Sequence, residues 1–216
     1  MEMRPADCPQ KWEYRDFPNG ASILQNRCAA IIVSIRRGSV PECAIAGDTR
    51  SMHRKMFEGL TPPECDYFAG NYRGDPFKCL RHLKVGVAGD SAVGVAPEKV
   101  LSDLREFAQA VKLGLQKHEA ALALPNAQIS SQDKFLYYVS FVCVTLCEFL
   151  RIHPYANGNG HISRFIVWWL LGKYGHWPKK WPLDQRPAPP YTELLSRHRQ
   201  GDCLPLEMYV LRCIAG

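Results

Sequence analysis

The sequence lacks any apolar run long enough to cross a lipid bilayer. The longest run, Phe165 to Leu171, is far shorter than the roughly 20 residues of a membrane-spanning helix. The N-terminus also lacks a basic segment followed by an apolar stretch, which is the pattern of a secretory signal peptide. The sequence therefore predicts a protein without a membrane segment.

The nine cysteines lack the spacing of a metal site or of a C-x-x-C redox motif. Cys143 and Cys147 lie four residues apart on an expected helix, and we interpret them as small apolar core residues rather than as a metal or redox pair. With no signal peptide, this scatter favours free thiols in a reducing cytoplasm.

A strong charge bias is absent too. The net charge is +6 and the pI is about 8.8, which suits anionic ligands such as nucleotides. It falls short of the clustered basic charge of a nucleic-acid-binding protein. With 216 residues, 46% of them hydrophobic, the composition is typical of one globular domain.

What the sequence does contain is one dense run of specialised residues, from Arg151 to Trp169. Asn157-Gly158-Asn159-Gly160 readily adopts positive φ, and such a turn can direct successive N–H groups toward an anion. A helix N-terminus favours phosphate at this point, and Arg164 adds a positive charge one turn later. The helix is indicated by apolar residues at its spacing: Ile162, Phe165, Ile166, Trp169 and Leu170.

His153 stands directly before Pro154, which disfavours helical backbone at His153. We therefore expect His153 at the end of the preceding helix, facing the same turn. A titratable base beside a phosphate-binding turn indicates phosphoryl or nucleotidyl transfer. The alternative is a Gly/Asn turn joining two core helices, with His153 bonded to a carbonyl.

The run His153-Pro154-Tyr155-Ala156-Asn157-Gly158-Asn159-Gly160-His161-Ile162-Ser163-Arg164 resembles the Fic-domain motif HPFx(D/E)GNGRxxR. Upstream, M-H-R-K-M-F and F-A-G-N-Y-R-G resemble the family's H-R-x-[LM]-F and W-A-G-x-x-R pair. The resemblance implies an all-α Fic-type helical domain with a small β-hairpin flap. Its expected parts are an N-terminal arm and helix (1–47), a Fic core (48–175, flap near 84–96) and a C-terminal helical extension (176–216).

The family activity implied by this resemblance is transfer of AMP from ATP to a Ser, Thr or Tyr hydroxyl of a target protein. His153 would be the general base, and Mg²⁺ would be held at position 157. The phosphates would be bound by Gly158, Asn159, Gly160, His161 and Arg164.

Three positions depart from the motif. Tyr155 for Phe is a mild change, but Asn157 replaces the acidic Mg²⁺ ligand, and a neutral carbonyl is a weaker ligand for Mg²⁺. His161 replaces the first arginine, so triphosphate affinity should fall unless a residue from elsewhere substitutes. Two alternatives stay open: a catalytically weakened binding or regulatory protein on a Fic scaffold, and a transferase that uses a different phosphate-containing donor.

The segment from Lys84 to Pro97 alternates small and β-branched residues around a Gly-Asp turn, which predicts a hairpin. In the Fic family this flap pairs with an extended segment of the target protein. An ordinary surface hairpin is the alternative. The docking residues would be Val85, Gly86, Val87, Ala88, Val93, Gly94 and Val95.

Many Fic proteins carry an inhibitory (S/T)-x-x-x-E-(G/N) string, which this sequence lacks. The nearest match, Ser102 to Glu106, is followed by Phe107. Inhibition by a separate antitoxin-like chain, or loss of activity, is therefore more plausible than inhibition by the chain itself.

The remaining helices are predicted from apolar spacing and caps. Trp12, Tyr14 and Phe17 are expected to pack an irregular N-terminal arm onto the core. Ser131 is expected to cap a long central helix that ends at the active-site turn. The other predicted helices lie at 21–37, 48–57, 100–115, 191–199 and 206–214. Within the first of them, the run I-I-V-S-I is also compatible with a strand.

Overall fold

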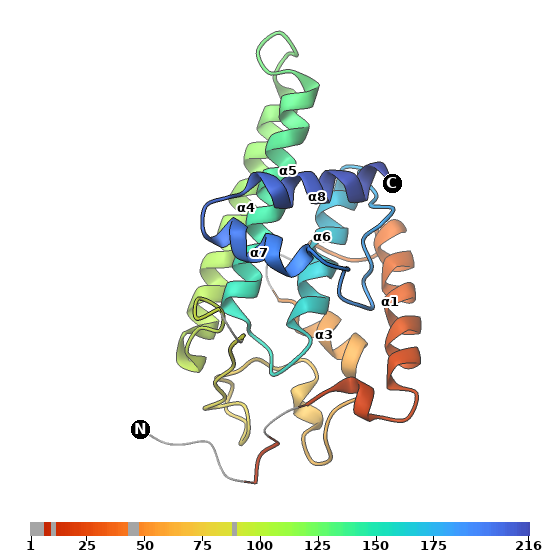
Figure 1. Cartoon of the computed structure of the whole chain (residues 1–216), viewed down its shortest axis with the longest axis vertical. Coiled ribbons are helices and arrows are strands. Elements are labelled where there is room, and N and C mark those ends of the chain that lie inside the picture. The colour runs from red at the N-terminus through yellow and green to blue at the C-terminus, as the bar shows by residue number, and fades with distance from the viewer. Residues whose placement is uncertain (1–6, 10–11, 43–47, 88–89) are drawn as a thin grey trace.

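The computed structural model describes residues 7–9, 12–42, 48–87 and 90–216. Within those residues it is all-α, with seven α-helices and no strand (Figure 1). Short 3-10 turns lie at Tyr14–Asp16, Asp66–Phe68 and Pro97–Lys99. The helices are α1 (Gly20–Arg36), α3 (Arg50–Phe57), α4 (Val100–Ala123), α5 (Ser131–Ile152), α6 (Asn159–Lys173), α7 (Tyr191–Arg199) and α8 (Leu204–Ala215).

The central helix α5 packs against α4, α6, α7 and α8. Its N-cap is Ser130, whose hydroxyl accepts the Asp133 N–H at 3.1 Å, so the predicted cap at Ser131 is wrong by one residue. By length and hydropathy alone α5 could cross a membrane, yet half of its most apolar window is buried within the domain. A core helix of a soluble protein has the same composition.

The helix α4 continues eight residues beyond the predicted end at position 115. Its last turns pack along the start of α5, where the buried His118 ring stacks on Tyr138 at 4.1 Å. Figure 1 shows the resulting α4–α5 pair projecting beyond the other helices. Contact with α5, rather than the apolar spacing of α4 itself, sets its length.

The helix α6 is buried along nearly its whole length and carries the core of the domain. Two of its tryptophans satisfy their indole N–H groups on other segments: Trp168 bonds the Trp181 carbonyl at 2.9 Å and Trp169 the Val40 carbonyl at 3.1 Å. The N-terminal arm packs as predicted, since Trp12 is buried and donates to the Leu60 carbonyl at 2.6 Å. The helix α6, which begins at the candidate site, is therefore fixed by contacts with segments before and after it in the chain.

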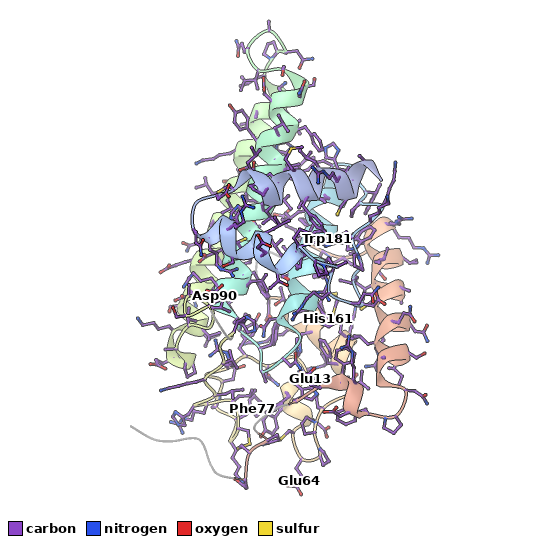
Figure 2. All side chains as sticks on the ribbon, in the orientation of Figure 1. Glu13, Glu64, Phe77, Asp90, His161 and Trp181 are labelled. Atoms are coloured by element: carbon purple, nitrogen blue, oxygen red, sulfur yellow. A yellow bond between two sulfur atoms is a disulfide. The ribbon has the colours of Figure 1, made fainter. Side chains whose placement is uncertain are left out.

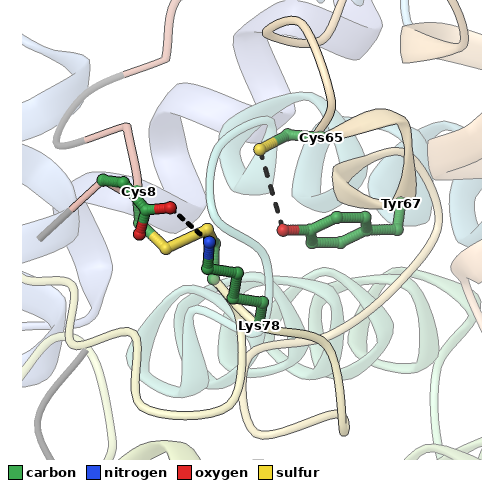
Figure 3. Close-up of a disulfide and its surroundings, with 6 residues drawn as sticks. Cys8, Cys65, Tyr67 and Lys78 are labelled. Carbon is green, nitrogen blue, oxygen red and sulfur yellow. Dashed lines mark hydrogen bonds and ion pairs between the residues drawn. A yellow bond between two sulfur atoms is a disulfide. The ribbon is translucent and has the colours of Figure 1, made fainter. Parts of the chain in front are cut away.

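A disulfide joins Cys8 of the N-terminal arm to Cys79 (Figure 3). Beside it, Lys78 forms an ion pair with Asp7. The sequence predicted free thiols throughout, and this pair is a correction, because cysteines 71 residues apart in sequence give no local signal. The cytoplasmic location stays a prediction.

The segment predicted as a hairpin flap is a compact loop rather than a pair of strands over its described residues. It contains one isolated bridge, between Val87 and Asp90. Its returning arm is bonded to α5, where the Gly94 N–H donates to the Arg151 carbonyl at 2.8 Å. Gly94 lies so close to Val85 that a Cβ at Gly94 would be 2.1 Å from the Val85 carbonyl oxygen. The arm that contains Val85 and the arm that contains Gly94 are thus in close contact, without the ladder of hydrogen bonds that a hairpin would have.

Candidate active site

His153 is the first residue beyond the C-terminus of α5. Its backbone is left-handed, with φ of 53° and ψ of 58°. The ring Nδ1 lies 3.1 Å from the Leu150 carbonyl oxygen, so Nδ1 carries the proton and Nε2 keeps its lone pair. Burial lowers the pKa of His153 to about 4. His153 is therefore neutral at physiological pH and can accept a proton at Nε2.

The carbonyl groups around His153 converge on one buried guanidinium, that of Arg73. Arg73 donates to the Ile152 carbonyl at 3.0 Å and to the His153 carbonyl at 2.8 Å. It also donates to Leu83 at 3.1 Å and to Val95 at 2.9 Å, on either side of the flap. Burial lowers the pKa of Arg73 to about 10, which leaves it cationic. Arg73 thus ties the backbone at His153 to both ends of the flap.

A second buried histidine, His53 of α3, supports the loop after His153. Its Nδ1 accepts the Gly70 N–H at 3.0 Å, so its Nε2–H donates to the Asn157 carbonyl at 2.9 Å. The ring also stacks on Tyr155 at 3.8 Å. Burial lowers the pKa of His53 to about 3. Residues of the two upstream stretches are therefore in contact, and together they hold the loop.

Gly158 turns the chain into α6 with a φ of 81°. A Cβ at this position would lie 2.4 Å from Phe57 Cε2, so a side chain does not fit. The Gly158 N–H is taken by the Asn157 side-chain oxygen at 2.6 Å. The N–H groups of Asn159 and Gly160, in the first turn of α6, have no acceptor among the described residues. Two of the three predicted phosphate donors are therefore open at the positive end of the helix dipole.

Arg164 lies one turn further along α6 and is only 3% exposed. Its Nη2 donates to the Leu183 carbonyl at 3.1 Å, and its Nε has no partner among the residues that the structure describes. Its Nη1 is 3.1 Å from the position that a Cβ would take at Gly160, which places the guanidinium over the first turn of the helix. Burial lowers the pKa of Arg164. No described carboxylate pairs with this buried charge.

Asn157 does not fit the metal role that the motif implies at its position. Its side-chain amide donates to the Trp12 carbonyl, and its side-chain oxygen accepts the Gly158 N–H. The described residues also contain no cluster of three His, Cys, Asp or Glu side chains that could hold a metal. Asn157 instead joins the N-terminal arm to the loop.

His161 makes its contacts with the segment after α6 and with neighbouring aromatic rings. Its Nε2–H donates to the Asp184 carbonyl at 3.0 Å, and its ring meets the edges of Tyr14 and Phe57, each at 5.4 Å between centroids. Burial, followed by the nearby charge of Arg164, lowers the pKa of His161 to about 3. His161 is therefore a neutral packing residue that anchors the segment after α6.

Two cavities meet above the loop. One, of about 220 Å³, lies between the loop, the flap and α7 and reaches His153. The other, of about 460 Å³, lies between the loop and the N-terminal arm, where Figure 2 shows Glu13 and His161. A larger cavity of about 800 Å³, beside α7 and α8, contains none of the predicted site residues. Both loop cavities are lined by Asn157, Gly160, Arg164 and Arg186.

A third cavity, of about 280 Å³, approaches His153 from the outer arm of the flap. Gly86 and Val87 on that arm are exposed. His153 thus lies between a cationic cavity at the start of α6 and a groove along the flap. The groove is lined in part by Trp12, Leu83, Lys84, Val85, Gly86, His153 and Asn157.

The predicted residues are thus divided among several roles. Asn159 also holds the loop, since its side chain bonds both the N–H and the carbonyl of Tyr155. Ala88 of the flap lies outside the described residues.

Two residues of the site were not predicted from the sequence. Arg73 was missed although it lies in the F-A-G-N-Y-R-G stretch, and Arg186 was missed because no sequence signal exists for it. The cavity that reaches His153 is also lined by Val87, Val93, Asn157, Asn159, Gly160 and Arg164.

Comparisons with known proteins identify the family and the fold of the chain. A family model described as "Fic/DOC family" matches residues 46–171. The chain is 30% identical over 84 residues to "Protein adenylyltransferase Fic" of Drosophila mojavensis and 30% identical over 88 residues to that of Drosophila willistoni. These alignments cover 39% and 41% of this chain but only 16% and 17% of the relatives, so the chain matches about a sixth of their length.

A solved structure of a Fic domain containing signaling protein from Bacteroides thetaiotaomicron has the same fold. It superposes with a TM-score of 0.57 at 18% identity, over 89% of this chain and 66% of that chain. At this identity the likeness concerns the fold alone. The curated relatives match a region of 84 to 88 residues, whereas the structural likeness extends over most of the chain.

Proposed function

Because the chain belongs to the Fic/DOC family, we propose that it transfers AMP from ATP to a Ser, Thr or Tyr hydroxyl of a target protein. The observation that carries this proposal is the position of His153, between a cationic cavity and an open flap edge. Curated relatives named protein adenylyltransferase support it. The donor, the target and any inhibitory partner chain are part of the proposal.

In this reaction the target hydroxyl oxygen attacks the α-phosphorus of ATP. The new bond joins that oxygen to the α-phosphorus, the bond to the bridging α,β-oxygen breaks, and pyrophosphate leaves. His153 Nε2 takes the hydroxyl proton, because its Nδ1–H is held by the Leu150 carbonyl. The lowered pKa keeps Nε2 unprotonated well below neutral pH.

The negative charge that develops on the phosphates would be stabilised by fixed donors. The N–H groups of Asn159 and Gly160 and the guanidinium of Arg164 are in place before the nucleotide arrives, and preorganised donors can be worth several kcal/mol. Both polar side-chain atoms of Asn157 already make hydrogen bonds, and its oxygen is a neutral carbonyl rather than a carboxylate. No step of the proposal therefore depends on a protein-bound Mg²⁺.

The target would approach along the outer arm of the flap. The N–H groups of Val85 and Gly86 donate to no described residue. An extended segment of the target could pair with this edge and place its hydroxyl in the groove beside His153. The returning arm, fixed through Gly94 and Val95, would keep the edge in place.

The test is transfer from radiolabelled ATP, and from other nucleoside triphosphates, to proteins of a cell lysate. His153→Ala should abolish labelling while the dissociation constant for ATP stays within about twofold. His176→Ala is the matched control, since His176 packs near Phe135 and Tyr138, away from the site. Absence of label from every donor, with Mg²⁺, Mn²⁺ or neither, would count against the proposal.

A second candidate is a binding or regulatory protein that holds nucleotide without turnover. It is favoured by the commitment of Asn157 and His161 to packing contacts. Calorimetry separates the two: nucleotide binding that persists in His153→Ala, with no labelling by the wild type, supports this candidate. Mass spectrometry of a labelled target identifies the added group and tests for a donor other than ATP.

A further inference from the structure

The position that carries a phosphate-binding arginine in the Fic motif holds His161, and the structure gives this histidine a different task. His161 donates to the carbonyl of Asp184 at 3.0 Å. One turn along α6, Arg164 donates to the carbonyl of Leu183 at 3.1 Å. Two consecutive carbonyls of the segment after α6 are therefore hydrogen-bonded to α6, the helix that begins at the phosphate loop.

Arg186 follows this anchored stretch by two residues. It lines both cavities above the loop, together with Gly160 and Arg164. Arg186 is exposed, and no described carboxylate pairs with it. Its charge also lies near enough to Arg164 to contribute to the lowered pKa of Arg164, after the larger effect of burial.

Two guanidinium groups that form no ion pair with a described carboxylate thus line the same two cavities at the N-terminus of α6. Repulsion between them costs free energy in the empty site, and a bound polyanion relieves it. The Nε of buried Arg164 is a further donor, and no acceptor for it lies in the described part of the chain. This convergence has no use in packing, because Arg186 is on the surface.

We propose that Arg186 supplies the guanidinium that the motif lacks at position 161, and that His161 positions it by anchoring the Leu183–Arg186 segment. The ligand is a polyphosphate, the di- or triphosphate part of a nucleotide. Arg186 is a direct ligand in this arrangement and His161 a positioning residue. The inference rests on the proposed nucleotide site but not on transfer of AMP.

Binding by calorimetry, with ATP, AMP and inorganic tripolyphosphate as the probes, tests this assignment. Arg186→Ala should weaken ATP and tripolyphosphate about tenfold or more and AMP by less than threefold, since the lost contact is to the outer phosphates. Arg186→Lys should recover only part of the affinity, because lysine lacks the guanidinium fork. Arg105→Ala, an exposed arginine of α4, is the charge-matched control.

The positioning role of His161 is tested by a double-mutant cycle. His161→Gln can still donate to the Asp184 carbonyl and should bind ATP almost as the wild type does, whereas His161→Ala should weaken ATP about fivefold. In the Arg186→Ala background His161→Ala should have little further effect. Additive effects of the two substitutions would overturn the positioning role.

The assignment of Arg186 is overturned if Arg186→Ala weakens ATP no more than Arg105→Ala does. It is also overturned if the wild type binds neither ATP nor tripolyphosphate at millimolar concentration. Labelling of a target with no effect of Arg186→Ala on ATP affinity would remove this inference and leave the proposed function intact. ATP binding that depends on Arg186, without labelling from any donor, would support this inference and count against the proposed function.

Discussion

The three histidines around the loop predict an unusual loss of stability in mild acid. Folding lowers the pKa of His53 and His161 to about 3 and that of His153 to about 4. In the unfolded chain each should titrate near 6.5. Between pH 6.5 and 4 the unfolded chain therefore binds more protons than the native one, and acid draws the equilibrium toward unfolding.

The size of this effect follows from linkage. Each histidine should cost about 1.4 kcal/mol of the unfolding free energy between pH 7.5 and 5.5, or about 4 kcal/mol for the three together. By pH 4.5 the loss reaches about 8 kcal/mol, which is comparable with the 5–15 kcal/mol stability of a typical domain. The loss of stability between pH 7.5 and 5.5 reports on the histidines rather than on the acidic groups, because carboxylates with ordinary pKa values do not titrate in that interval.

The assay is urea unfolding followed by tryptophan fluorescence at half-unit steps from pH 7.5 to 5. His161→Gln removes one titrating group while keeping a donor for the Asp184 carbonyl. Its stability should fall by about 1.4 kcal/mol less than that of the wild type over pH 7.5 to 5.5. A wild-type loss below about 1 kcal/mol over that range would refute the reasoning that these rings stay neutral in the native state.

Three further predictions concern the contacts that hold the site. Arg73→Lys should lower the unfolding free energy by about 2–3 kcal/mol in urea titrations, because an ammonium cannot reach all four carbonyls that the guanidinium bonds; an unchanged midpoint would contradict this role. Asp90→Asn should increase hydrogen exchange in the flap, since it breaks the ion pair to Arg199 of α7, and in the Arg199→Gln background it should add nothing. Cys8→Ser should lower the melting temperature under oxidising conditions but not in excess dithiothreitol, because only the oxidised wild type has the link to Cys79.

Local patterns in the sequence were enough to predict most of the helices. The apolar stripe of α6 and the cap and apolar face of α5 are properties of neighbouring residues, and each predicted helix is present. The end of α4 was missed because it depends on contact between His118 and Tyr138 of α5. The flap was predicted to form strands, yet its alternating pattern yields one bridge, since its bonds go to Arg73 and to α5.

The candidate site was predictable only where its residues are contiguous. The loop from His153 to Arg164 was found from one motif. Arg186 was not found, because no local spacing in the sequence marks it. Arg73 stands in the F-A-G-N-Y-R-G stretch, but its four carbonyl partners lie elsewhere in the chain and gave its role no local signal. His161 was noted as a departure, but its partner is a backbone carbonyl at position 184, which a sequence does not reveal.

The loop is completed by contacts from distant parts of the chain, and this bears on when the molecule becomes competent during its synthesis. The hairpin of α5 and α6 can form as soon as both helices have emerged, with His153 and the open N–H groups in place. The segment that carries Arg186 is made later, and the Trp12 carbonyl that holds Asn157 must be brought back from the start of the chain. Such long-range closure is slow compared with the formation of helices. A nascent chain therefore carries the loop from His153 to Arg164 before it carries the contacts from distant segments that complete the candidate site.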